Sequence, residues 1–188
     1  MKVVHSRGYL PHWELREVPQ SITFRLANSL PSSLLKKWSK ELSNLQCDRI
    51  SLERRRRIEA ALDQGYGEPW LCHPEIGLLV EDTILHGDKS RYRLHEWVVM
   101  PNHVHVLATP LEGWTLTTIL QGWKSVTARY ANRILARSGR FWAPEYYDRA
   151  IRNEQHFQNV QNYIRLNPVK AGLCSSPELW QFSSAANR

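Results

Sequence analysis

Cysteine is scarce in this sequence, and the three that occur, Cys47, Cys72 and Cys174, are widely separated. No Cys-x-x-Cys pair is present, so the sequence predicts neither a disulfide framework nor a cysteine-bound zinc ion. Long apolar runs are also missing, since no stretch reaches the roughly 18 residues of a membrane-spanning helix. The first residues do not resemble a signal peptide. These absences favour a reducing cytoplasm and argue against a membrane partner.

Acidic residues are fewer than basic ones, with 18 Asp and Glu against 25 Lys and Arg and a sequence pI near 9.5. A basic surface favours a polyanionic partner, because each phosphate that a protein neutralises releases a condensed counterion. Hydrophobic residues make up 42% of the chain and include eight Trp. They can form a core and also offer rings on which bases stack. We expect one domain, residues 1–188, that binds nucleic acid.

Hydrophobic periodicity predicts a mixed α+β fold. Residues 1–20 are interrupted by proline and are expected to be irregular. Pro31-Ser32-Ser33 predicts the start of a helix with a serine cap, and Pro168 predicts the end of the last helix. The expected strands are 21–26, 92–100, 103–108 and 145–151, and the expected helices are about 33–46, 51–64, 74–87, 115–137 and 153–166.

This order of elements fits a ferredoxin-like (split βαβ) antiparallel sheet with helices on one face. A helical insert, at about residues 33–87, follows the first strand, and an added C-terminal helix contains Tyr163. The second face of the sheet is expected to remain available.

Two histidines stand two residues apart in the predicted strand 103–108. Because alternate residues of a strand share a face, His103 and His105 are expected to point to one side and Val104 to the other. Two neutral imidazoles side by side form half of a metal site. An Asn or carboxylate oxygen, together with a substrate phosphate, would complete a site suited to Mg²⁺ or Mn²⁺. The same pattern also fits two polar residues on the hydrated face of a strand.

Tyr163 and Asn167 are four residues apart in the predicted last helix, so they are expected to lie on one helix face about a turn apart. A phenol can attack a phosphodiester when a metal ion polarises the phosphate. The amide oxygen of Asn167 is then a candidate for the missing metal ligand. The structural alternative is a hydrogen-bonded, partly buried tyrosine and an asparagine that ends a helix before Pro168.

Two sequence blocks are far more specific than these single residues. They are Met-Pro-Asn-His-Val-His, residues 100–105, and Tyr-x-x-x-Asn-Pro-Val-Lys-Ala-Gly-Leu, residues 163–173. Together they resemble the REP-associated tyrosine transposases, a branch of the HUH single-strand transposases and nucleases. Further agreement lies in residues 8–13, 20–26, 97–99, 123–127, 147–152 and 180–185, so the resemblance covers nearly the whole chain.

The resemblance implies a metal-dependent endonuclease and strand transferase for single-stranded DNA. His103, His105 and Asn167 would bind Mg²⁺ or Mn²⁺, and Tyr163 would be the nucleophile that forms a 5′-phosphotyrosine. The implied substrates are hairpins of repetitive extragenic palindromes with a short guide tetranucleotide at their foot. The implied location is the bacterial cytoplasm, in association with the nucleoid. The general base is not evident, and His95 and hydroxide are candidates.

The oligomeric state is open at this stage. Single-strand transposases of insertion sequences dimerise and exchange the tyrosine helix between subunits. The short connection from residue 151 to Tyr163 allows either arrangement. We expect a monomer whose tyrosine acts with its own histidines, with a dimer as the alternative.

Residues 120–172 hold nine Lys or Arg and three Asp or Glu, so this segment has most of the excess positive charge. Basic side chains here are expected to contact phosphates, although each is equally compatible with a solvated surface cation. The run Arg54–Arg57 must point around its helix, so at most two members can follow one DNA backbone. The candidate DNA contacts are Lys124, Arg129, Arg133, Arg149, Arg152, Arg165 and Lys170.

Three other functions remain compatible with the sequence. A regulatory protein that binds hairpin DNA or RNA without cleaving it would need the same basic surface. A split βαβ module that binds RNA would present aromatic residues on paired strands for base stacking. A hydrolase of small phosphoesters is the least favoured, because it would not need a tyrosine nucleophile.

Overall fold

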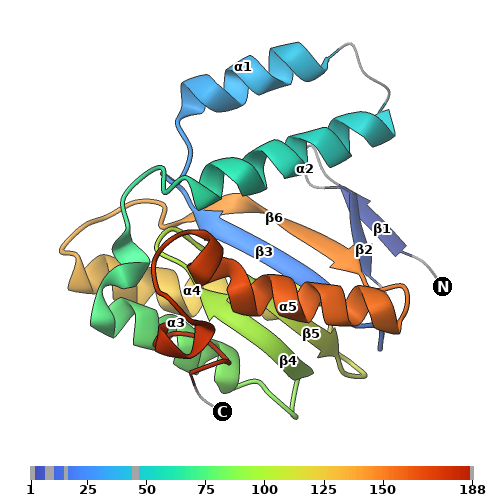
Figure 1. The fold of residues 1–188 in the computed structure, drawn as a ribbon, viewed down its shortest axis with the longest axis vertical. Coiled ribbons are helices and arrows are strands. Elements are labelled where there is room, and N and C mark those ends of the chain that lie inside the picture. The colour runs from blue at the N-terminus through green and yellow to red at the C-terminus, as the bar shows by residue number, and fades with distance from the viewer. Residues whose placement is uncertain (1–2, 7–10, 15–16, 44–46, 187–188) are drawn as a thin grey trace.

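A four-stranded antiparallel sheet, with strand order β4-β5-β3-β6, forms the centre of the molecule (Figure 1). The computed structural model describes residues 3–6, 11–14, 17–43 and 47–186. The strands are β3 (Gln20–Leu26), β4 (Tyr92–Val99), β5 (His103–Pro110) and β6 (Trp142–Ala150). The helices are α1 (Ser32–Leu42), α2 (Cys47–Asp63), α3 (Pro74–Leu85), α4 (Leu116–Ile134) and α5 (Glu154–Lys170), with 3-10 turns η1 (Trp70–Cys72) and η2 (Pro177–Leu179). This topology confirms the predicted ferredoxin-like α+β fold.

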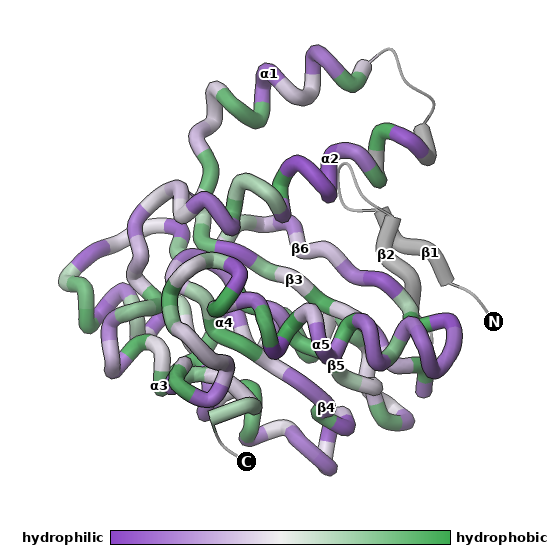
Figure 2. Tube along the Cα trace, in the orientation of Figure 1, coloured by the Kyte–Doolittle hydropathy of each residue, from purple (hydrophilic) through white to green (hydrophobic). Residues whose placement is uncertain are grey.

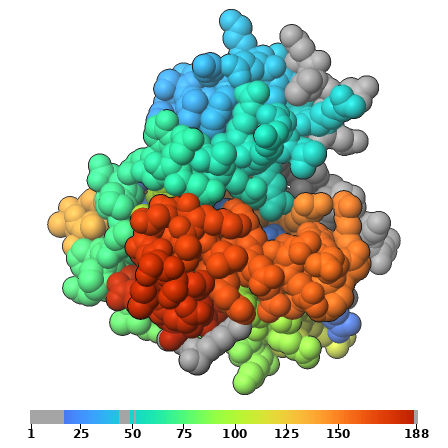
Figure 3. All heavy atoms as spheres, in the orientation of Figure 1, coloured from blue at the N-terminus to red at the C-terminus, as the bar shows by residue number. Residues whose placement is uncertain are grey.

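Helices pack on both faces of the sheet. α3 and α4 cover the face that presents Phe24 and Val106 to the main core. α5 packs on the opposite face through Ile164, against Leu107 of β5. On that same face, Tyr147 of β6 packs into a smaller cluster with α2. The predictions that helices cover only one face and that the second face remains available are therefore wrong. In the space-filling view, the α2 segment borders α5 on the visible surface (Figure 3).

The N-terminal prediction is wrong in two respects. Within the segment expected to be irregular, β1 (Val3–Ser6) and β2 (Pro11–Glu14) pair as a separate antiparallel sheet. At the first helix, Pro31 occupies the N-cap position and no side chain caps the helix. The expected serine cap is absent because Ser32 is already helical. Short strands are difficult to predict because four residues show little periodicity.

α5 continues through Pro168, where the sequence predicted its end. Beyond this point, Ala171 N donates to Asn167 O at 3.0 Å and Leu173 N donates to Pro168 O at 2.9 Å. Asn167 and Pro168 are both buried. The packing of this turn offsets the helical hydrogen bond that a proline removes. The helix therefore presents Asn167 one regular turn after Tyr163.

The segment after α5 covers the free edge of β4. Val99 N donates to Phe182 O at 2.9 Å, and Ser184 N donates to Trp97 O at 3.0 Å. Phe182 also enters the main core and lies against Gly77 of α3. An unpaired strand edge is thereby closed by the chain itself.

Gly77→Ala is expected to lower the free energy of unfolding by about 1–3 kcal/mol through overpacking. A Cβ atom at Gly77 would lie 2.4 Å from the Phe182 ring, and the ring is buried with its backbone bonded to β4. Gly122→Ala in α4 is the matched control, because a Cβ there meets nothing within 4 Å. It is expected to stabilise the helix by about 1 kcal/mol. Urea unfolding followed by tryptophan fluorescence measures both changes, and equal stability of the two variants would contradict the prediction.

The helices alternate in polarity along their length. Figure 2 shows hydrophilic and hydrophobic residues interleaved along α1, α2 and α5, as in helices with one buried and one exposed face. Within the described ranges, no helix combines the length and the apolar character needed to cross a bilayer.

Candidate functional site

Two imidazoles meet on the face of the sheet that α5 covers. His103 and His105 are alternate residues of β5, so the strand places both side chains on this face. The residues are 1% and 2% exposed, and their Nε2 atoms are 3.0 Å apart. The prediction that the two histidines point to one side is confirmed. The alternative, two polar residues on a hydrated face, is wrong because both side chains are buried.

The Nδ1 atom of each imidazole forms a hydrogen bond with a polar side chain. Asn102 Oδ1 lies 2.6 Å from His103 Nδ1. Thr23 Oγ1 lies 2.8 Å from His105 Nδ1. Because Asn102 Nδ2 donates to the Tyr66 carbonyl at 2.8 Å, its Oδ1 is the acceptor and His103 Nδ1 is the donor. The His103 Nε2 lone pair is therefore free toward His105, in the tautomer that a metal ligand requires.

Both histidines are held in the neutral state. Burial lowers the pKa of His103 to about 3. Burial, followed by the charges of His103 and Arg55, lowers the pKa of His105 well below its ordinary value. Neutral imidazole is the form that binds a metal ion.

Tyr163 and Asn167 on α5 face this histidine pair. The Tyr163 ring packs edge-on against His105 of the same chain, with centroids 5.3 Å apart. Asn167 is 2% exposed and donates a side-chain hydrogen bond to the Tyr163 hydroxyl. Among the described residues, Asn167 Oδ1 has no hydrogen-bond partner. A buried amide oxygen in this state is unusual, and a bound cation would satisfy it.

The donor set fits a divalent cation of the magnesium type. In the part of the chain that the structure describes, no three His, Cys, Asp or Glu side chains group as a metal site. The Asn167 oxygen, which lacks a partner among the described residues, is the candidate for a third protein ligand. Two ligands at about 2.1 Å from an octahedral ion, at right angles, lie about 3.0 Å apart, which matches the separation of the two Nε2 atoms. Nitrogen and neutral oxygen ligands leave the other positions to water and phosphate.

The Tyr163 hydroxyl is held in its protonated form. Its pKa is raised, with burial as the largest cause and the carboxylates of Glu59 and Asp63 on α2 next. The hydrogen bond from Asn167 acts in the opposite direction. The Lys170 ammonium lies 5.4 Å from the Tyr163 ring centroid. Ionisation of the phenol therefore depends on positive charge near its oxygen.

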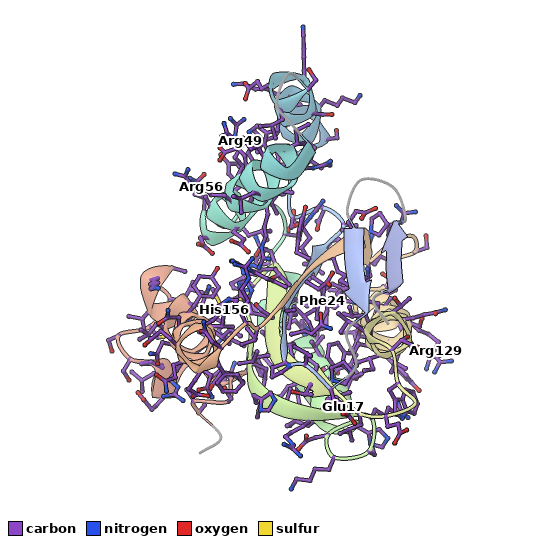
Figure 4. All side chains as sticks on the ribbon, turned by 90° about the vertical axis from the view of Figure 1, so that its right-hand side faces the viewer. Glu17, Phe24, Arg49, Arg56, Arg129 and His156 are labelled. Carbon is purple, nitrogen blue, oxygen red and sulfur yellow. The ribbon has the colours of Figure 1, made fainter. Side chains whose placement is uncertain are left out.

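The predicted DNA contacts on α4 lie on the face opposite to the histidine pair. Arg129 and Arg133 are exposed there, with their guanidinium carbons 5.0 and 5.7 Å from the Tyr130 ring centroid. Figure 4 shows Arg129 and His156, which belongs to α5, on opposite sides of the sheet. Lys124 Nζ donates to two backbone carbonyls in β6, at 2.6 and 3.0 Å. The α4 residues are thus not brought together with Tyr163.

The other four predicted contacts lie on the side of the histidine pair. Lys170 is exposed beside Tyr163, and Arg149 and Arg152 are exposed at the end of β6. Arg165 differs, because its Nη2 lies 3.3 Å from Oε2 of Glu96, a fully buried residue. This ion pair ties α5 to β4.

His95, one candidate for the general base, has other neighbours. Its Nε2 lies 2.8 Å from Thr109 Oγ1, and its ring packs edge-on against Phe157. Phe157 precedes Tyr163 by more than a helical turn, about 9 Å along α5. The structure does not favour His95 as the residue that accepts the phenol proton.

Sequence reasoning missed the residues that support the site. Asn102 has no predicted role from the sequence, although its position directly before His103 in the block 100–105 is an available signal. Thr23 gave no signal, because only the pairing of Thr23 with His105 across β3 and β5 reveals its role. Glu59 on α2 also gave no signal in the sequence, because its charge raises the pKa of Tyr163 only once α2 and α5 are brought near each other by the fold.

Comparison with known proteins agrees with this geometry. Residues 84–167 match the family described as "Transposase IS200 like". The matched residues include both histidines, Tyr163 and Asn167, so the similarity covers the segment that contains the candidate site.

Two relatives make the similarity more specific. A REP-associated tyrosine transposase of Escherichia coli (strain K12) is 28% identical over 93 residues, which are 50% of this chain and 54% of that protein. The alignment thus spans about half the length of this relative. A solved structure of a REP-associated tyrosine transposase bound to a REP hairpin has a TM-score of 0.60 at 16% identity, covering 96% of this chain and 84% of that one. The fold is therefore that of a REP-associated tyrosine transposase.

Proposed function

We propose that this protein is a metal-dependent endonuclease and strand transferase that cuts single-stranded DNA through a 5′-phosphotyrosine on Tyr163. The proposal rests on three features that lie close together in one chain. The Tyr163 ring contacts His105, the two histidine Nε2 atoms face each other, and Asn167 presents a buried oxygen without a partner in the described residues. A tyrosine with only a structural role would explain neither the two facing Nε2 atoms nor the buried Asn167 oxygen that has no partner in the described part of the chain.

His103, His105 and Asn167 are the residues that would hold Mg²⁺ or Mn²⁺. When bound, the ion would polarise the scissile phosphate and stabilise charge on the leaving oxygen. Asn102 and Thr23 fix the imidazoles, so the nitrogen ligands need no rearrangement to bind.

Tyr163 performs the bond exchange. The phenol loses its proton, its oxygen bonds to phosphorus, and the bond from phosphorus to the 3′ oxygen breaks. The 3′ oxygen takes up a proton, which leaves a free 3′-OH and a 5′-phosphotyrosine. A 3′-OH from a second strand can reverse these steps, and this reversal transfers the strand. The hydrogen bond from Asn167 and the Arg55 charge favour the ionised phenol, because both lower the pKa of Tyr163.

The proposed substrates are REP-type hairpins with an adjoining single strand. Support comes from the relatives, one named a REP-associated transposase and one solved with a REP hairpin. The contact of Tyr163 with its own His105 supports a monomer that acts in cis. Action on chromosomal palindromes also implies a cytoplasmic, nucleoid-associated protein.

The test is formation of a covalent protein–DNA adduct. The full chain, incubated with a labelled single-stranded hairpin and Mn²⁺, is expected to give a product that persists in denaturing electrophoresis. Excess EDTA should remove this product, and the fully duplex form of the same DNA should give none. Tight binding without an adduct in Mg²⁺ or Mn²⁺ would refute cleavage and identify a hairpin-binding regulator instead.

A further inference from the structure

A group of basic side chains lies on the face of the histidine pair but outside the catalytic residues. Its members come from three elements and one loop: Arg55 from α2, Arg149 from β6, Arg152 from the loop after β6, and His156 from the first turn of α5. Convergence of like charges from separate elements is unfavourable unless an anion neutralises it.

The strand register places Arg149 relative to the catalytic histidine. Thr23, which contacts His105, pairs with Tyr147, and Ser21 pairs with Arg149. Arg149 thus shares the face of His105, two strands across and two residues along. With strands about 4.8 Å apart and a rise of about 3.4 Å per residue, the two backbones are roughly 12 Å apart.

The four side chains are close enough to act on one another. The pKa of Arg149 is lowered, by burial first and then by the charges of Arg152 and Arg55. The pKa of His156 is lowered by burial and then by all three arginines. The Arg55 charge also acts on His105 and on Tyr163. Arg55, which pairs with Glu59 on α2, is therefore within electrostatic reach of both this cluster and the catalytic site.

Among the described residues, ion pairs neutralise only part of this charge. Arg55 Nε pairs with Glu59 at 2.8 Å. Neither Arg149 nor Arg152 forms an ion pair among the residues that the structure describes, and both are exposed. His156 Nδ1 accepts a hydrogen bond from Arg152 N at 3.2 Å. The neutral ring then has its proton on Nε2, where it remains a donor.

We propose that Arg149, Arg152 and His156, linked to the catalytic site by Arg55, form a second phosphate-binding site for single-stranded DNA. The site would hold the strand that adjoins the cleaved phosphodiester, and in this respect it rests on the proposed function. Guanidinium and imidazole donors contact phosphates without reading bases, so the site would fix the path of the strand and not its sequence.

The test measures how DNA binding depends on salt, because each phosphate contact contributes to the slope of log Kd against log salt concentration. The probe is fluorescently labelled oligo-dT, titrated with the full chain in EDTA at several KCl concentrations. Arg149→Ala/Arg152→Ala is expected to reduce the magnitude of the slope by about 1.4, from two lost contacts to a single strand. Arg149→Lys/Arg152→Lys should retain the slope, since the charges remain.

The matched control is Arg129→Ala/Arg133→Ala, which removes two exposed arginines from α4 on the opposite face. It should leave the slope unchanged. An unchanged slope in Arg149→Ala/Arg152→Ala, or an equal loss in the control, would overturn the proposal.

The same assay separates this proposal from the catalytic one. Binding in EDTA requires no cleavage, so a wild-type protein that forms no covalent adduct would refute the proposed reaction without affecting the slope. Conversely, adduct formation with an unaltered slope would refute only the second phosphate site.

Discussion

Tyr163→Phe is expected to abolish the covalent protein–DNA adduct, with a loss of about 10⁴-fold or more in the cleavage rate. The change removes only the oxygen that would bond to phosphorus. It retains the ring that packs against His105 at 5.3 Å. Hairpin affinity should therefore stay within about twofold, because the electrostatic contacts to phosphates are unchanged. Denaturing electrophoresis measures the adduct, and fluorescence anisotropy measures binding.

Tyr130→Phe is the matched control for this experiment. Tyr130 lies on α4 and is 40% exposed, on the face away from the histidines. Its variant should form the adduct at the wild-type rate. A Tyr163→Phe protein that still cleaves would show that another nucleophile acts, and the assignment of Tyr163 would be wrong.

Asn167→Ala is expected to weaken Mn²⁺ binding by about 100-fold, and adduct formation at limiting Mn²⁺ by a similar factor. The substitution removes the buried Oδ1 atom that has no partner within the described residues, and leaves the two imidazoles in place. Titration of the metal-free protein with Mn²⁺, followed by electron paramagnetic resonance of the free ion, gives the affinity without any catalytic readout.

Two variants keep this result interpretable. Asn167→Asp retains an oxygen ligand and should restore Mn²⁺ binding to near the wild-type value. Asn162→Ala alters an exposed asparagine beside Tyr163 on the same helix and should have no effect. If Asn167→Ala binds Mn²⁺ as tightly as the wild type, Asn167 is a structural residue and the third ligand lies elsewhere.

Local sequence was sufficient to predict the elements that form the site. The two-residue period of a strand places His103 and His105 together, and the helical period places Asn167 beside Tyr163. Both relations hold in the structure. The end of α5 was not predictable from local rules, because the burial of Pro168 is decided by packing against the rest of the chain.

The side of the sheet on which each helix packs could not be read from local sequence. Basic charge on α4 predicted a DNA-binding helix, yet α4 lies on the face away from His105. Right-handed connections between the strands place α3 and α4 together on one face. The position of α2 over the histidines, and hence the roles of Arg55 and Glu59, depends on contacts between distant segments.

The ion pair between Arg165 and Glu96 has a consequence for the movement of DNA. Arg165 stands two residues from Tyr163, and its bond to a fully buried carboxylate fastens the middle of α5 to the sheet. Ile164, between them, is itself fully buried. A cut 5′ end attached to Tyr163 would therefore stay in place, because the helix that contains Tyr163 is held to the sheet. In the proposed reaction, strand exchange then requires the incoming 3′ end to travel to the enzyme-bound end while the helix stays in place.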